Sequence, residues 1–348
     1  MQNESLLKLI KRIAPEQLLE IGRRAQVLTG IETMQPVGRR ALSTRLNLSE
    51  REVRAIATSL KDQGLLTLNA AGMQLTAKAQ DVLPGARDLS RALFGLNDLS
   101  QQLAHFLKVD YVVVIAGDAD EDKQVLKEVG RSAAHRIKQL LSNGITLAIG
   151  GGSTMLEISR GISSSVAHDI MVVPARGGIG SMVETQASVV AVEMARKLGA
   201  SYRVIHLPDS VDEATLQKMC KQKDVRETIE LLQKADVVVH GICGTMQTAK
   251  HRGMNAEECD ALIDAGAKGE ALGDFFDING KMVRQIKTVS YELTKMQKKP
   301  IMVAVAAGNS KAEAIIACIR HAPHNSLITD EGAANEMLAL LKKPMQNL

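Results

Sequence analysis

Aromatic side chains are scarce in this chain of 348 residues, which has no Trp, three Tyr and four Phe. Proteins that hold single-stranded nucleic acid stack its bases on such side chains, so this mode of binding is not expected. No run of apolar residues approaches the roughly 20 needed to span a bilayer, and Met1–Arg12 lacks the apolar core of a signal peptide. We therefore expect no contact with a membrane.

The chain also has few cysteines, which are Cys220, Cys243, Cys259 and Cys318. No two of them have the spacing of a CxxC motif. Closely spaced cysteines are typical of zinc sites and of disulfide frameworks. His251 has no second histidine at a metal-binding spacing. The sequence therefore predicts no metal site, and it favours a reducing cytoplasm.

Positive charge is concentrated in the first quarter of the chain. Residues 1–85 hold 12 Lys/Arg and 8 Asp/Glu, whereas the remaining residues hold 31 of each. A single core rarely exceeds about 250–300 residues, so a chain of this length is expected to have two domains. We place them at residues 1–88 and 89–348. Basic charge confined to the small domain indicates a surface that meets phosphates, although a solvated helical surface would have the same composition.

Residues 1–88 have the element order of a winged helix-turn-helix. The expected elements are helices at Glu16–Leu28 and Arg39–Leu46, a third helix that opens at Ser49, and a hairpin of Leu65–Leu68 with Met73–Leu75. Ser49 and Glu52 have the spacing of a capping box, which fixes the start of the third helix. Val53, Ile56 and Leu60 fall on one face of that helix, which is expected to be buried.

The opposite face of the third helix is predicted to bind DNA. The N-terminal turns of such a helix enter the major groove, where Arg pairs with guanine edges and Thr contacts bases. Arginines on the preceding helix would hold phosphates and fix the register. The expected DNA-binding residues are Arg39, Arg40, Arg45, Ser49, Arg51, Arg54 and Thr58. The alternative is a three-helix module that docks on another protein.

Residues 89–348 alternate short apolar strands with helices. The expected strands are Tyr111–Ala116, Ile145–Ile149, Ile170–Val173, Tyr202–His206, Asp236–His240, Ile301–Ala306 and Ser326–Thr329. This alternation predicts an α/β fold with a doubly wound, mainly parallel sheet that is covered on both faces. Such a sheet binds its ligands beyond the carboxyl ends of its strands.

The loop after the second of these strands is rich in glycine and hydroxyl side chains: Gly150, Gly151, Gly152, Ser153 and Thr154. It leaves a strand and opens a helix, so its backbone N–H groups and the helix dipole favour an anion. It matches neither a Walker A motif nor a dinucleotide-binding motif. A small phosphorylated ligand is the functional interpretation, and a tight packing turn is the alternative.

Other cations are expected near the same edge of the sheet. Arg176 follows the end of the third strand, and Lys311 stands near the start of a later helix. The loop Gly241–Thr245 precedes Lys250, His251 and Arg252. Each of these cations alone could be an ordinary surface group, but several at one edge suit a ligand with two phosphates.

Taken together, these segments resemble the SorC/DeoR-type sugar-sensing transcriptional regulators of bacteria. The resemblance covers nearly the whole chain and includes the helix-turn-helix, Gly150–Thr154, Pro174–Gly178, Gly241–Thr245, Gly269–Asp274, Gly308–Lys311 and Leu327–Glu331. It implies an effector domain with the fold of sugar-phosphate isomerases and deaminases. It also implies a repressor of a glycolytic operon, with fructose 1,6-bisphosphate or a related phosphosugar as effector.

The resemblance also implies roles for individual residues. One phosphate would lie on Gly151, Gly152, Ser153 and Thr154, although the closest relatives are expected to have Thr where this chain has Ser153. Arg176 and Gln186 would reach the ligand from the neighbouring strand–helix junction. His251, Arg252 and Lys311 would supply cationic contacts, and Glu270 would accept hydrogen bonds from sugar hydroxyls.

A homodimer or homotetramer on double-stranded operator DNA is the assembly we expect, with no cofactor and no catalytic residue. The competing hypothesis is a sugar-phosphate isomerase or deaminase with a fused helical module. Such an enzyme needs a positioned general acid and base, and Glu270 and His251 are of suitable type.

Overall fold

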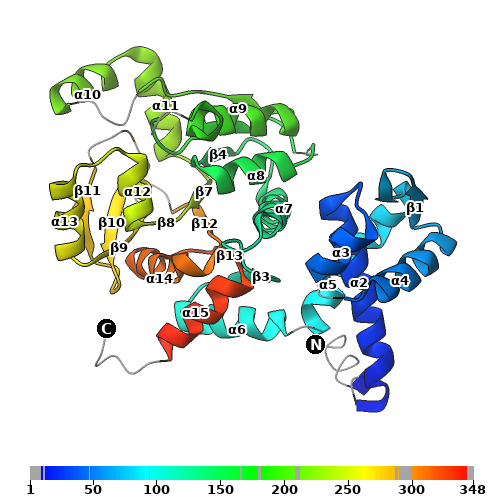
Figure 1. Cartoon of the computed structure of the whole chain (residues 1–348). Helices are drawn as coiled ribbons and strands as arrows, with labels where there is room; N and C mark the ends of the chain where they lie inside the picture. The colour runs from blue at the N-terminus through cyan, green and yellow to red at the C-terminus, as the bar shows by residue number, and fades with distance from the viewer. Residues whose placement is uncertain are drawn as a thin grey trace. The chain divides into compact units, whose positions relative to one another are not determined.

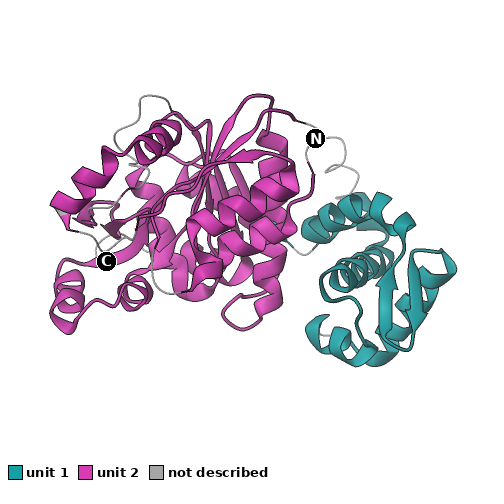
Figure 2. Ribbon diagram, turned by 90° about the horizontal axis from the view of Figure 1, so that it is seen from above, with its two compact units in different colours: residues 1–98 teal, residues 99–348 magenta. Residues whose placement is uncertain are grey.

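The computed structural model describes residues 9–10, 12–46, 48–93, 95–164, 167–178, 182–207, 212–286, 289 and 299–342. The chain divides into two compact units, residues 1–98 (unit 1) and 99–348 (unit 2), shown in different colours in Figure 2. The boundary expected after residue 88 falls inside a helix of unit 1, Leu83–Leu93.

Unit 1 is a helical module with a small hairpin (Figure 1). Its elements are α2 (Pro15–Met34), α3 (Arg39–Leu46), α4 (Glu50–Asp62), β1 (Leu66–Asn69), β2 (Gly72–Leu75), η1 (Ala77–Asp81) and α5 (Leu83–Leu93). The core unites the helices with the hairpin through Ile31, Leu42, Val53 and Met73. α2 continues past the expected Leu28 because the buried face of the helix continues to Ile31.

The hairpin has the form of a wing. β1 and β2 pair antiparallel, and Val37 forms an isolated antiparallel bridge with Met73. The turn is closed by the side chain of Asn69, which accepts the N–H groups of Ala71 and Gly72 at 2.9 and 3.1 Å. The predicted winged helix-turn-helix is therefore confirmed as a fold.

Unit 2 is built on a seven-stranded sheet in which every described pairing is parallel. In spatial order the strands are β3 (Tyr111–Ile115), β13 (Ser326–Asp330), β12 (Ile301–Val305), β7 (Val237–Gly241), β4 (Thr146–Ile149), β5 (Met171–Pro174) and β6 (Ser201–Tyr202). Six of these strands are largely buried and the edge strand β6 is exposed, which suits a sheet that is covered on both faces. The α/β prediction is confirmed.

Helices cover both faces of this sheet (Figure 2). One face packs on α7 (Lys123–Leu140), α8 (Ser153–Gly161) and α9 (Ala187–Leu198). The other helices of unit 2 are α6 (Leu96–Leu107, which contains the division between the units), α10 (Glu213–Cys220), α11 (Lys223–Gln233), α12 (Thr245–His251), α13 (Ala256–Asp264), α14 (Ala312–His321) and α15 (Glu331–Leu341), with 3₁₀ turns at η2 (Val183–Thr185) and η3 (Asn309–Lys311).

A second, antiparallel sheet was not expected from the sequence. Its order is β11 (Met282–Gln285), β10 (Asp274–Asp277), β9 (Ala267–Ala271) and β8 (Cys243–Gly244). It packs on α14 so closely that a Cβ at Gly269 would lie 2.6 Å from the Cα of Ala314. This sheet carries Glu270 towards the site described below.

Glycine also sets the distance between α7 and α8. A Cβ on Gly130 of α7 would lie 2.8 Å from the backbone of Glu157, and one on Gly161 of α8 would lie 3.1 Å from the Cα of Arg131. Each helix thus presents a glycine where the other approaches. The two helices approach each other closely at both positions, so the C-terminal half of α8 is held against α7.

Candidate effector site and nucleic-acid interface

The parallel sheet has one topological switch point, between β4 and β7. From β4 the chain continues outward through β5 and β6, and from β7 it continues in the other direction through β12 and β13. A crevice forms outside the carboxyl ends of the strands at such a point and is the usual ligand site of open α/β sheets. The loops that leave β4 and β7 begin at Gly150 and Ile242, so the predicted glycine loops flank this point.

The loop after β4 is shaped by its own backbone. The N–H of Gly150 donates to Val239 O and that of Gly152 donates to Thr185 O, both at 2.8 Å. Gly152 has a φ of 103° and is the N-cap of α8. Two amides of the loop therefore fix its conformation and, contrary to the expectation from the sequence, do not face a ligand.

The first turn of α8 supplies the donors that remain. Its first helical bond runs from Leu156 N to Gly152 O at 3.0 Å, so the N–H groups of Ser153, Thr154 and Met155 are not used by the helix. Ser153 is exposed and Thr154 is buried. The amides and the helix dipole together favour a negative charge at this end of α8.

Gly151 lies against the segment that precedes α9, so Gly151→Ala is expected to disturb the loop. An added Cβ would lie 2.6 Å from Thr185 O and 3.0 Å from Ala187 N. We expect a loss of about 1–3 kcal/mol in the free energy of unfolding, as in other overpacked sites, and weaker binding of fructose 1,6-bisphosphate by calorimetric titration. Gly85→Ala is the control, since Gly85, like Gly151, has no positive φ, and its Cβ would meet no atom within 4 Å. Unchanged affinity in Gly151→Ala would show that this loop does not hold the ligand.

Arg176 and Glu270 form a buried ion pair at the same edge. Arg176 Nη1 lies 3.1 Å from Glu270 Oε1, with side chains 10% and 5% exposed. Arg252 Nη2 lies 3.7 Å from the same oxygen, and the N–H of Gly273 donates to it at 2.7 Å. Two predicted cations and the predicted carboxylate therefore meet, although they come from the loop after β5, from the end of α12 and from β9.

Lys311 acts electrostatically on the same group of residues, as the pKa of Cys243 shows. Burial raises the pKa of the Cys243 thiol, and Glu270 raises it further, while the charges of Lys311 and Arg176 oppose the shift. Cys243 and Thr248 are part of the site and were not singled out by sequence. Thr248 Oγ1 donates to Glu270 Oε2 at 3.5 Å.

The start of η3 is filled by the chain's own carboxylates. Asn309 N donates to Asp118 Oδ1 at 3.2 Å, and Ser310 N donates to Asp120 Oδ2 at 2.8 Å. Asp330 holds the same loop by accepting Gly308 N at 2.8 Å. This second helix start is therefore not a phosphate cradle, and Lys311 contributes through its ammonium group alone.

Gln186 and His251 have different surroundings. Gln186 lies beside the glycine loop, because Gly151 packs on its neighbours Thr185 and Ala187, and its amide oxygen would be 2.7 Å from a Cβ at Gly178. His251 is exposed at the last residue of α12. The structure thus places Gln186 beside the glycine loop, whereas His251 faces solvent.

On unit 1, the capping box predicted at the start of α4 is present. Glu52 N donates to Ser49 Oγ at 3.2 Å and Ser49 N donates to Glu52 Oε2 at 2.9 Å. The Ser49 hydroxyl also donates to Glu52 Oε2 at 2.7 Å, and this bond, together with the one from Ser49 N, lowers the pKa of the Glu52 carboxyl. Ser49 therefore fixes the start of the helix that is expected to enter the major groove.

The predicted exposed face of α4 is also present. Val53, Ile56 and Leu60 are buried, and Arg51, Arg54 and Thr58 are exposed. On α3, Arg39 and Arg40 are exposed and Arg45 is half-buried. The basic side chains thus have the placement that duplex recognition by a helix-turn-helix requires.

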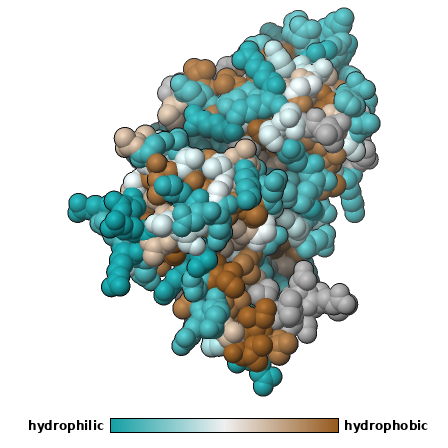
Figure 3. Space-filling model, turned by 90° about the vertical axis from the view of Figure 1, so that its right-hand side faces the viewer, coloured by the Kyte–Doolittle hydropathy of each residue, from teal (hydrophilic) through white to brown (hydrophobic). Residues whose placement is uncertain are grey.

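An apolar surface lies elsewhere on this unit. Figure 3 shows hydrophobic side chains gathered at its lower end, over the N-terminal part of α2, where Leu9, Ile13, Leu19 and Ile21 are among the exposed residues. Clustered apolar side chains of this kind are typical of contacts with protein. None of the helices in the described part of the chain combines the length and apolar character of a membrane span.

Two family models match the chain in tandem. "CggR N-terminal DNA binding domain" matches residues 21–89, and "Putative sugar-binding domain" matches residues 91–339. The central glycolytic genes regulator of Priestia megaterium is 34% identical over 336 residues, which are 96% of this chain and 98% of that protein.

Solved structures agree with this assignment. A SorC family transcriptional regulator from Enterococcus faecalis is 35% identical with a TM-score of 0.65, covering 69% of this chain and 99% of that one. The full-length sorbitol operon regulator SorC from Klebsiella pneumoniae has the same fold at 18% identity, with a TM-score of 0.66 and coverage of 92% and 98%. The chain therefore belongs to the SorC-type family of bacterial transcriptional regulators, with an N-terminal DNA-binding domain followed by a sugar-binding domain.

Proposed function

We propose that this chain is a cytoplasmic repressor of glycolytic genes whose affinity for operator DNA falls when fructose 1,6-bisphosphate binds to unit 2. The name of the Priestia megaterium relative supports glycolytic genes as the target. One observation supports this effector. The start of α8 and the buried ion pair of Arg176 with Glu270 both lie at the switch-point edge of the parallel sheet. A ligand with phosphates at both ends matches this arrangement.

One phosphate accepts hydrogen bonds at the start of α8, from the amides and hydroxyls of Ser153 and Thr154. Gly150, Gly151 and Gly152 give the loop the shape that leads into this helix start. The other phosphate faces Arg176, Arg252 and Lys311, with His251 at the rim. Gln186 and Glu270 bind the sugar hydroxyls between them. Thr245 adds a donor at the start of α12, since its buried Oγ1 has no hydrogen-bond partner among the described residues.

Operator recognition is assigned to α3 and α4. Arg51 and Arg54 contact base edges, Thr58 contacts a base or its methyl group, and Arg39, Arg40 and Arg45 bind phosphates. Ser49 acts by fixing the start of α4. Homodimers or homotetramers place two such helices on repeated half-sites, and the phosphosugar changes how the subunits meet.

Fluorescence anisotropy with duplex fragments from glycolytic promoters tests the proposal. Binding should weaken steeply with salt. Fructose 1,6-bisphosphate should lower the affinity by a coupling free energy of about 1–3 kcal/mol, roughly 5- to 150-fold. Binding that no phosphosugar changes would contradict the effector assignment, and binding that ignores salt would favour a protein-docking role for unit 1.

The proposal assigns no catalytic residue and no cofactor. Glu270 is engaged by Arg176 and by Gly273 N, and His251 is exposed, so these two residues do not form an acid–base pair. Turnover of a sugar phosphate in a coupled isomerase assay would support the enzyme hypothesis instead.

A further inference from the structure

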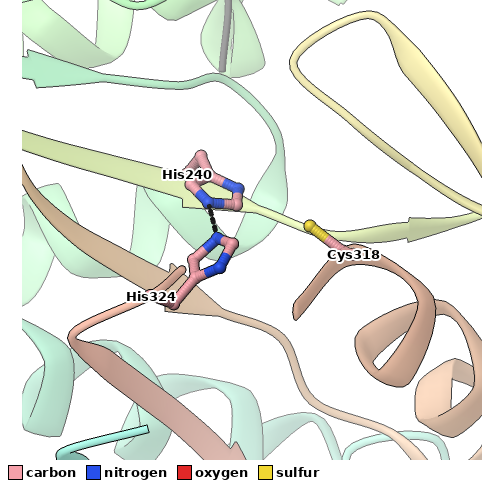
Figure 4. A group of neighbouring side chains, drawn as sticks. All are labelled: His240, Cys318 and His324. Atoms are coloured by element: carbon pink, nitrogen blue, oxygen red, sulfur yellow. Dashed lines mark hydrogen bonds between the residues drawn. The ribbon is translucent and has the colours of Figure 1, made fainter. Parts of the chain in front are cut away.

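Three potential metal ligands meet in the interior of unit 2 (Figure 4). His240 is on β7, Cys318 is on α14, and His324 lies between α14 and β13. One ligand atom from each lies within 4.8 Å of the others. Their exposed fractions are 1%, 0% and 4%, so the cluster is closed to solvent.

The hydrogen bonds of the two imidazoles fix which nitrogen carries the proton. His324 Nδ1 lies 2.7 Å from Ala322 O and His240 Nδ1 lies 3.1 Å from Gly241 O. A carbonyl oxygen can only accept, so each Nδ1 donates its proton. Each Nε2 then presents a lone pair, and the two Nε2 atoms lie 2.9 Å apart.

Two lone pairs at this distance need a cation between them. A shared proton would leave a net positive charge in a buried setting, which desolvation disfavours. A Cu⁺ ion with one thiolate ligand has no net charge and avoids that cost, whereas Zn²⁺ keeps one positive charge but forms coordination bonds with all three ligands. Cys318 is in place to supply that ligand.

We propose that His240, Cys318 and His324 form a site for one thiophilic d¹⁰ cation of the Zn²⁺/Cu⁺ class. Two imidazoles with one thiolate are a ligand set that these ions prefer. Imidazoles bound to metal characteristically donate their other N–H to a carbonyl oxygen, as both rings do here. On binding, the Cys318 thiol releases one proton to solvent and each Nε2 contributes its lone pair.

The spacing of the two imidazole nitrogens needs little adjustment. Metal–nitrogen bonds of about 2.0–2.1 Å at a tetrahedral angle place two nitrogens roughly 3.3 Å apart, compared with the present 2.9 Å. The described cluster has three ligands, which favours Cu⁺ over Zn²⁺, because structural zinc is almost always four-coordinate. The ion would link α14 to the central strand β7.

Local spacing in the sequence does not indicate this cluster, because its three residues come from separate segments. It lies beneath the edge that carries the glycine loop, since a Cβ on Gly150 would be 3.6 Å from the Cα of His240. The inference rests on these buried contacts and is independent of the effector.

The test uses the full chain with Cys220→Ser, Cys243→Ser and Cys259→Ser, which leaves Cys318 as its only thiol. Anaerobic titration with Co²⁺, a spectroscopic substitute for Zn²⁺, should produce a thiolate-to-metal charge-transfer band that saturates at one equivalent. Zn²⁺ should displace Co²⁺, and Cu⁺ affinity is measured by competition with a colorimetric chelator. The tighter of the two ions identifies the occupant.

Two further variants separate binding from folding. Cys318→Ser should remove the band, and His324→Gln, which keeps the thiol, should lower affinity for the tighter ion by about 10-fold or more. Circular dichroism checks that each variant is folded. The proposal is overturned if the single-thiol protein binds neither Zn²⁺ nor Cu⁺, or if His324→Gln leaves both affinities unchanged.

Discussion

Arg176→Ala is expected to abolish the effect of fructose 1,6-bisphosphate on operator binding and to destabilise unit 2 by about 3–5 kcal/mol, the usual cost of breaking a buried ion pair. Arg176 Nη1 lies 3.1 Å from Glu270 Oε1. Without it, the buried Glu270 carboxylate keeps Arg252 at 3.7 Å and the N–H of Gly273. Urea denaturation measures the stability, and anisotropy with operator DNA measures the response.

A companion variant separates the two effects. Arg176→Gln keeps a hydrogen-bond donor for the Glu270 carboxylate, which also keeps Arg252 beside it, so this variant should lose less stability than Arg176→Ala while the response to the phosphosugar stays absent. Affinity for DNA without ligand should stay near that of the parent protein in both variants. A stable Arg176 variant that still releases DNA on addition of phosphosugar would contradict the assignment of this residue to the effector.

Replacing Arg51 and Arg54 with Ala should weaken operator binding and leave the binding of fructose 1,6-bisphosphate unchanged, the reverse of the effect of Arg176→Ala. Each loss is expected to cost about 1–3 kcal/mol of operator affinity if the side chain reads a base edge. The fold should tolerate the changes, because both side chains are exposed and Ala favours a helix. Gel-shift titration against operator and scrambled duplexes measures the loss of discrimination.

Lys61→Ala is the matched control for these two variants. Lys61 is an exposed cation in the last turn of the same helix, whereas Arg51 and Arg54 lie in its first turns. Its replacement should leave the preference for operator over scrambled DNA unchanged. Equal losses from all three positions would indicate a general electrostatic contact in place of base readout.

Much of unit 1 follows from local patterns in the sequence. The Ser49–Glu52 spacing, the apolar stripe on α4 and the Asn69–Gly72 turn each depend on residues close together in the chain, and all three are observed. The parallel strands of unit 2 follow from their apolar composition. Since parallel strands end at one edge, the predicted clustering of the glycine loop with Arg176 and Lys311 follows from topology as well.

The second sheet could not be predicted in the same way. β9 has the sequence AKGEA, in which Glu270 is buried, so the strand shows no apolar alternation. Its position depends on the close approach of Gly269 to α14, a contact across distant segments. The burial of Arg252 against Glu270 and the exposure of the adjacent His251 depend on this sheet, so no local pattern distinguishes the two neighbours.

The glycines at the crossing of α7 and α8 restrict how a signal can leave the effector site. Because Gly130 and Gly161 bring the two backbones into contact, α8 cannot slide or tilt without forcing the larger helix to follow. α8, whose start is proposed to meet a phosphate, is thus tied to α7. We therefore expect a ligand to cause movement more readily on the side of Arg176 and Glu270, which are joined by an ion pair of side chains.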